Sequence, residues 1–236
     1  MAEVKARQFA MYTFEVMSEV TLDAEQLSAA KDNFMQIFQK ALSDDEVTVR
    51  VAALKAITAF CNGIDDADVV LGFAPIIPAL LKTVVDALKA DEDQGRAALE
   101  SMDDLARTHP EIWKKEVPQL INVVSQIMNE KSFEPGTRTI AAEVILSLSS
   151  EMAAPIRKAA ETATQYVPAL VKMLTEVEED EATWLAGADE EDIQSTGPAS
   201  CAKEGIKRLA ESLGSKTTLP IVQPMIAECL GSENWV

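Results

Sequence analysis

The chain is poor in the residues on which disulfide-rich domains, metal sites and hydrolase active sites depend. Among its 236 residues there are three cysteines, Cys61, Cys201 and Cys229, and one histidine, His109. The cysteines form no Cys-x-x-Cys pair, so they support neither a disulfide framework nor a structural zinc site, and we expect them to be reduced and packed. His109 stands directly before a proline, which is typical of a helix C-terminus.

Positive charge is also scarce. The chain has 21 basic and 39 acidic residues, a formal net charge of −18. A nucleic-acid-binding surface needs a cluster of basic residues, so we expect no nucleic-acid partner. No apolar run reaches the roughly 18 residues of a membrane helix, and the N-terminus lacks the hydrophobic stretch of a secretory signal, so we expect no membrane contact either.

Glycine and aromatic residues are few, whereas 47% of the residues are hydrophobic. Long stretches consist of Ala, Leu, Glu, Lys and Met, which lose little side-chain freedom in a helix. The composition therefore predicts a globular, all-α protein. With one histidine and no complete nucleotide-binding or calcium-binding motif, we predict that the chain is not an enzyme and needs no cofactor or metal.

Apolar residues recur three and four positions apart in successive segments, which is the pattern of amphipathic helices. We assign four helix pairs and a single helix at each end, at 24–62, 66–109, 111–151 and 155–213, and at 1–20 and 217–230. Proline followed by apolar residues is expected to open the first helix of several pairs, at Pro78, Pro118, Pro168 and Pro224. Two helices in a period near 40 to 47 residues are typical of HEAT repeats, which stack because one pair cannot bury its hydrophobic face alone.

The predicted fold is thus an all-α solenoid of stacked HEAT-type helix pairs, with about four full repeats and a half repeat at each end. We expect residues 1–236 to form one right-handed superhelical array that is an excerpt of a longer solenoid. A helical bundle is the alternative, but the repeated proline and arginine positions favour the solenoid.

The clearest single unit, residues 34–54, resembles the HEAT consensus. In the turn between the two helices of this unit, we expect Asp45 to cap the second helix and Arg50 to reach an aspartate of a neighbouring repeat. Arg96 and Arg138 lie at similar places in later pairs. Because charge-assisted hydrogen bonds have a defined geometry, such a ladder of side chains would fix the angle between repeats.

An acidic insertion at 176–197 interrupts the fourth pair. Residues 176–192 contain nine acidic side chains, and no Lys or Arg occurs from Met173 to Ala202. Like-charge repulsion alone would give a solvated, inert loop. Trp184 inside the charge run favours a basic protein partner instead, because the acidic field raises encounter rates and the indole supplies contact area.

This acidic segment and its flanks resemble the importin β family, and specifically its importin-5 (importin β3) branch. The similar segments are 177–192, 141–158, 209–220 and the terminal Asn234-Trp235, in the same order as in that branch. The resemblance implies an interior fragment of a nuclear import receptor, a monomer that shuttles between cytoplasm and nucleus through nuclear pores.

The partners that this resemblance implies are the small GTPase Ran in its GTP form, basic cargo proteins and FG-repeat nucleoporins. By matching position, the acidic-loop role falls to Glu178, Glu179, Asp180, Glu181, Trp184, Asp189, Glu190, Glu191 and Asp192. The main Ran contact of the family lies in N-terminal repeats that are not in this chain, so we do not expect this segment alone to bind Ran tightly.

Two alternatives stay open from the sequence. The first is a HEAT scaffold subunit of a phosphatase or a translation-associated complex, which would lack an acidic insertion with a tryptophan. The second is an enzyme-associated helical domain centred on His109 and Cys201.

Overall fold

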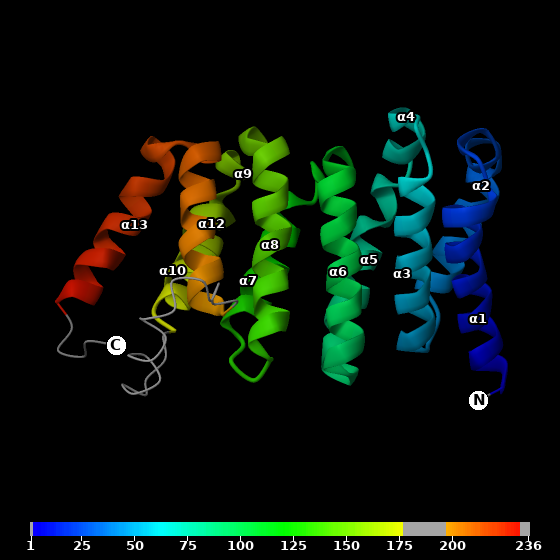
Figure 1. Ribbon diagram of the computed structural model, residues 1–236, viewed down its shortest axis with the longest axis horizontal. Coiled ribbons are helices and arrows are strands. Elements are labelled where there is room, and N and C mark those ends of the chain that lie inside the picture. The colour runs from blue at the N-terminus through cyan, green and yellow to red at the C-terminus, as the bar shows by residue number, and fades with distance from the viewer. Residues whose placement is uncertain (1, 177–196, 232–236) are drawn as a thin grey trace, which may run out of the picture. The chain divides into compact units, whose positions relative to one another are not determined.

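The computed structural model describes residues 2–176 and 197–231, and all regular secondary structure in these residues is helical (Figure 1). The α-helices are α1 (Ala2–Val16), α2 (Ala24–Leu42), α3 (Val47–Asn62), α4 (Ala67–Leu71), α5 (Ile77–Ala90), α6 (Glu92–Thr108), α7 (Val117–Asn129), α8 (Pro135–Glu151), α9 (Ala153–Lys158), α10 (Val167–Leu174), α12 (Pro198–Leu213) and α13 (Ser215–Leu230). The short 3-10 and π-helical turns are η1 (Met17–Thr21), η2 (Ala74–Ile76), η3 (Pro110–Trp113) and η4 (Thr162–Tyr166).

The helices form pairs with a regular period. The first helical elements of the four pairs begin at Ala24, Ala67, Pro110 and Ala153, so each starts 43 residues after the one before. This interval falls in the range of about 40 to 47 residues that HEAT and armadillo repeats share. The predicted all-α solenoid of HEAT-type pairs is therefore confirmed.

Proline positions explain where several helices begin. Pro78, Pro118 and Pro168 are the second residues of α5, α7 and α10, as the sequence predicted. Proline is favoured there because an N–H at that point has no partner inside the helix. Pro224 was wrongly expected to open a helix, since it lies inside α13. That helix already begins at Ser215, because Gly214 with φ of 84° makes the turn that ends α12.

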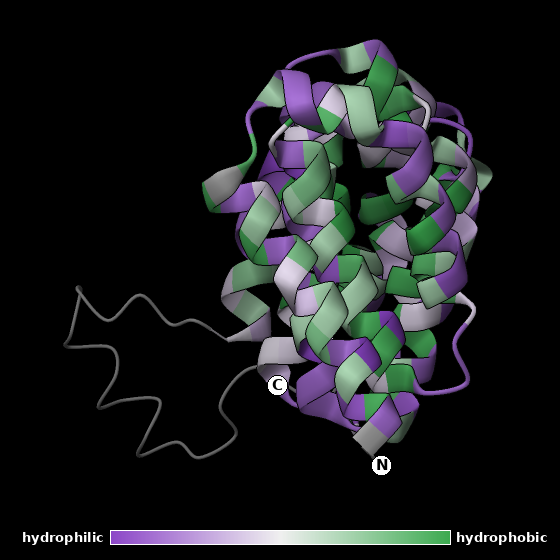
Figure 2. Ribbon diagram, turned by 90° about the vertical axis from the view of Figure 1, so that its right-hand side faces the viewer, coloured by the Kyte–Doolittle hydropathy of each residue, from purple (hydrophilic) through white to green (hydrophobic). Residues whose placement is uncertain are grey.

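The residues fall into two compact units, Met1–Glu116 and Val117–Val236. In the first unit, α1, α3 and α6 pack side by side and form what we call the second-helix layer, with α2 and α5 behind them (Figure 1). Between these layers lies an aromatic cluster of Phe14, Phe34, Phe38, Phe60 and Phe73, with ring centroids 4.7 to 6.5 Å apart. Hydrophobic ribbon segments accordingly lie toward the space between the helices (Figure 2).

In the second unit, α8 and α12 form the second-helix layer, against which α7, α10 and α13 pack. Tyr166 is fully buried and donates a hydrogen bond of 2.6 Å to the carbonyl of Ala142, which joins the two layers. Gly205 allows α12 to approach closely, because a Cβ there would lie 3.0 Å from the Leu146 Cδ1 atom.

The stretch Ala67–Ala90 is apolar and long enough to cross a membrane by length and composition, with a mean hydropathy of 1.8 over an 18-residue window. In the structure this stretch is broken into α4, η2 and α5, and Ile77 and Leu80 are buried in the core of the first unit, which accounts for its hydropathy. Cys61 is buried as expected, but Cys229 is exposed on α13.

Candidate functional site

The nine residues assigned to the acidic loop, Glu178 to Asp192, lie outside the described residues. The acidic run does begin inside the described part, at Glu176, two residues after the end of α10. The candidate site is therefore built from two features of the described residues, the arginines of the second-helix layers and a groove on α1, α3 and α6.

Arg50, in the first turn of α3, joins two successive repeats. Its Nη1 atom donates to the backbone carbonyls of Asp44 at 2.6 Å and Asp45 at 3.2 Å, and its Nη2 atom donates to the Asp86 carboxylate in α5 at 3.0 Å. The predicted cap is wrong, because the carboxylate that accepts a backbone N–H here belongs to Asp44, not Asp45; it accepts from Glu46 at 3.0 Å. Asp45 takes part through its backbone carbonyl alone.

Arg138, in the first turn of α8, has the same arrangement in the second unit. Its Nε atom donates to the carbonyl of Met128 near the end of α7 at 2.8 Å. Both of its terminal nitrogens bond the Glu176 carboxylate, at 2.7 Å each. The hydrogen bonds from this buried guanidinium lower the pKa of Glu176, although partial burial of the carboxylate opposes them. Arg138 thus holds the residue at which the acidic run begins.

A further arginine of this kind was missed in the sequence. Arg7 in α1 bonds the Asp44 carboxylate through Nε at 2.7 Å and Nη2 at 3.0 Å, and these bonds lower the pKa of Asp44. Arg7, Arg50 and Arg138 precede their carboxylate partners by 37, 36 and 38 residues. That recurring spacing could have identified Arg7. Arg96 forms an ion pair of 2.6 Å with Asp93 in its own helix.

A continuous groove runs over the second-helix layer of the first unit. One part has a volume of about 570 Å³ and the adjoining part about 270 Å³, and both are lined by Glu15, Lys55 and Ala97. We call the larger part the aromatic half and the smaller part the acidic half. This groove could not be predicted from the sequence, because its lining comes from helical segments far apart in the chain that only packing brings together.

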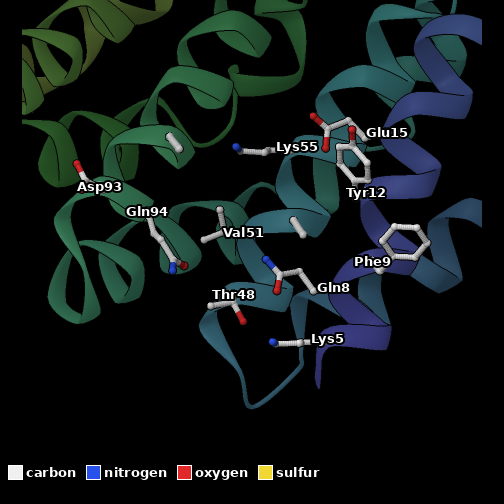
Figure 3. A pocket seen from close by; sticks show the side chains of 12 residues that line it. Lys5, Gln8, Phe9, Tyr12, Glu15, Thr48, Val51, Lys55, Asp93 and Gln94 are labelled. Carbon is white, nitrogen blue, oxygen red and sulfur yellow. The ribbon is translucent and has the colours of Figure 1, made fainter. Parts of the chain in front are cut away.

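The aromatic half is lined by Phe9 and Tyr12 of α1 and by Thr48 and Val51 of α3 (Figure 3). The two rings are exposed by 68% and 54%, with centroids 6.3 Å apart. An exposed aromatic pair in a concave site offers contact area to an apolar group at low conformational cost. The ammonium groups of Lys5 and Lys55 border the same half (Figure 3).

The acidic half carries four carboxylates, from Glu15, Glu19, Glu100 and Asp104, and one ammonium, from Lys55. Partial burial raises the pKa of Glu15, and Glu19 adds to this effect, whereas Lys55 opposes it. Asp104 accepts hydrogen bonds from the Asn62 amide at 2.7 Å and from Arg107 at 2.9 Å, so the surplus of negative charge comes from the other three carboxylates. Of these, Glu19 and Glu100 are exposed and Glu15 is half-buried. Such a surplus attracts cationic side chains, because a bound cation relieves the mutual repulsion of the carboxylates.

The enzyme alternative has little support from the geometry. His109 ends α6 with an N–H bond to the Leu105 carbonyl at 3.0 Å and lies in the first unit, whereas Cys201 lies in the second. Burial and the neighbouring Glu143 raise the pKa of the Cys201 thiol to about 12. A thiol in this environment stays protonated at neutral pH and is a poor nucleophile.

The comparisons with known proteins agree with one another. A family profile described as IPO5-like TPR repeats matches residues 2–123, and an importin repeat profile matches 130–220. Importin subunit beta-3 of Saccharomyces cerevisiae is 25% identical over 86% of this chain, which spans 19% of that protein. The probable importin-5 homolog of Dictyostelium discoideum is 24% identical over 75% of this chain, which spans 16% of it.

Solved structures show the same fold. Crystal structures of Kap121p alone and of Kap121p bound to Nup53p each superpose with a TM-score of 0.82 at 21% identity, and cover 96% of this chain and 22% of the other. Because the IPO5-like profile alone covers more than half of its residues, the chain belongs to the IPO5-like importin family.

Proposed function

We propose that the chain is a segment of a nuclear import receptor that shuttles between cytoplasm and nucleus and binds basic cargo proteins, RanGTP and nucleoporins. Family membership supports this role, and so do the complexes of a structural neighbour. Kap121p has been crystallised with Nup53p, Pho4p, Ste12p and the SUMO protease Ulp1p. These proteins suggest the kinds of partner to test with this chain.

The observation that carries the proposal is the acidic half of the groove. Four carboxylates on α1, η1 and α6 border a space that one lysine enters, and Asp104 among them is paired with Arg107 at 2.9 Å, which leaves a net negative charge. The groove extends across three helices, which suits an extended peptide with several lysines or arginines better than a single small cation. The net charge of −18 adds a long-range attraction that steers basic cargo toward the chain.

The acidic segment at 176–192 is proposed as a second surface for a basic partner, either RanGTP or a lysine-rich cargo signal. This proposal is supported by the negative charge of the segment, read from the sequence, and by Trp184 within it. Arg138 would contribute by fixing Glu176, from which the segment starts.

The test is the affinity of a fluorescent lysine-rich peptide for the 236-residue chain. Glu19→Gln with Glu100→Gln should weaken binding by about three- to tenfold at low salt, because two attractive charges are lost. A control with Asp32→Asn and Asp65→Asn removes the same charge from exposed positions outside the groove. Equal losses in both variants would mean that the groove is not the binding surface.

A further inference from the structure

The aromatic half of the groove differs in charge from the acidic half. Lys5 and Lys55 both line it, and neither ammonium forms an ion pair within the part of the chain that the structure describes. Of its two carboxylates, Asp93 is bonded to Arg96 at 2.6 Å, which leaves the single carboxylate of Glu15 against the two ammonium groups. The charge available to a ligand next to Phe9 and Tyr12 is therefore positive.

Lys55 lies where the two halves meet, together with Glu15 and Ala97. It is half-buried on α3 and extends toward α6, across the groove from Tyr12 and Glu15 on α1 (Figure 3). A peptide lysine placed at this point would meet a like charge that has lost part of its hydration, which is unfavourable. A carboxylate at the same point would gain a charge-assisted hydrogen bond.

We propose that the groove binds a bipolar segment of a partner protein. In this segment an aromatic or aliphatic side chain packs on Phe9 and Tyr12, a neighbouring carboxylate pairs with Lys55, and lysines or arginines follow in the acidic half. Lys55 is then a specificity-determining residue, because it selects against segments that are basic throughout. This inference rests on the proposed function and adds a sequence preference to it.

The experiment compares two fluorescent peptides by anisotropy with the 236-residue chain. The bipolar peptide contains Phe-Asp-Gly-Ser-Lys-Lys, and the all-basic peptide contains Phe-Lys-Gly-Ser-Lys-Lys. We expect the bipolar peptide to bind about three- to tenfold more tightly, as one charge-assisted contact at a half-buried site would give. A third peptide with Ala in place of Phe loses its contacts with both Phe9 and Tyr12. It should therefore bind the native chain more weakly, and at least as weakly as the bipolar peptide binds a Phe9→Ala variant.

Charge reversal tests whether Lys55 is responsible for the preference between the two peptides. Lys55→Glu should reverse the preference, so that the all-basic peptide binds more tightly. Lys31→Glu makes the same charge change at an exposed position on α2, outside both halves, and should leave the preference intact. Circular dichroism and thermal melting verify that both variants fold.

Other outcomes overturn the inference in distinguishable ways. If the native chain binds the all-basic peptide as tightly as the bipolar one, or if the preference survives Lys55→Glu, the role of Lys55 is wrong while the proposed function stands. If neither peptide binds the native chain, the proposed peptide groove is wrong as well.

Discussion

At the scale of single residues, arginine is the side chain that joins successive repeats. Arg50 and Arg138 each bond a backbone carbonyl near the end of one helix and a carboxylate in or just after the first helix of the next repeat. A lysine could not make both contacts, because its single ammonium lacks the planar arrangement of donors. The identity of these residues therefore follows from the geometry of the repeat junction.

Arg138→Ala should lower the stability of the second unit by about 2 to 4 kcal/mol. The Glu176 carboxylate would lose both hydrogen bonds from the buried guanidinium, and the Met128 carbonyl would lose its donor. Arg107→Ala serves as a control, since that side chain is 63% exposed and pairs within its own helix; it should cost about 0.5 kcal/mol. Urea unfolding followed by circular dichroism measures both. Equal shifts in the two variants would mean that Arg138 contributes no more than a surface arginine.

The same ion pair predicts a dependence of stability on pH. Arg138 lowers the pKa of Glu176 from its ordinary value of 4.5. A carboxyl group whose pKa is lower in the folded state than in the unfolded state stabilises the fold at any pH above its pKa in the unfolded state. This stabilisation is lost as the pH falls through its pKa in the folded state. Glu176→Gln should therefore melt at a lower temperature than the native chain above about pH 5, and the difference should shrink below about pH 4. A difference that stays constant over this range would contradict the assignment.

At the scale of helices, the sequence predicted the pairs because their apolar residues follow the helical period. It did not predict that the first helical elements of the later pairs are broken, as α4, η2 and α5 are. The break depends on how Phe73 and Ile76 pack into the core, which periodicity does not reveal. The error between Asp44 and Asp45 has a similar origin, since neighbouring acidic residues are equivalent as caps until the turn geometry is known.

The groove on the second-helix layer of the first unit could not be predicted from the sequence for a related reason. Glu15, Glu19, Glu100 and Asp104 each look like part of a solvated helix face in the sequence, and only the packing of α1 and α6 on either side of α3 assembles them. The positions of Arg50 and Arg138 were easier to predict, because both lie in the first turn of a second helix.

The acidic segment gives a kinetic prediction at this scale. Changing Glu178, Glu179, Asp180 and Glu181 together to their amides should slow association with a basic partner, because the steering field is reduced. Trp184→Ala should instead speed dissociation, because contact area is lost. Stopped-flow measurements at low and high salt, with a receptor that includes the family's Ran-binding repeats, separate the two effects. Native rates in both variants would identify the segment as an inert spacer.

At the scale of the whole molecule, the chain combines stacked repeats with a strongly negative charge and a groove that concentrates carboxylates at one end. Stacked repeats present many side chains on one extended layer, which suits the recognition of long, flexible partner segments. The chain spans 19% of the length of importin subunit beta-3.

The central claim is that the layer of α1, α3 and α6 binds a lysine-containing peptide. Hydrogen–deuterium exchange of the chain with and without saturating bipolar peptide tests it most directly, because bound ligand slows the local opening of the helices it contacts. The account predicts slower exchange in α1, α3 and α6 and unchanged exchange in α2 and α5. Protection confined to α2 and α5, or no protection of the first unit at a peptide concentration that saturates the chain, would contradict it.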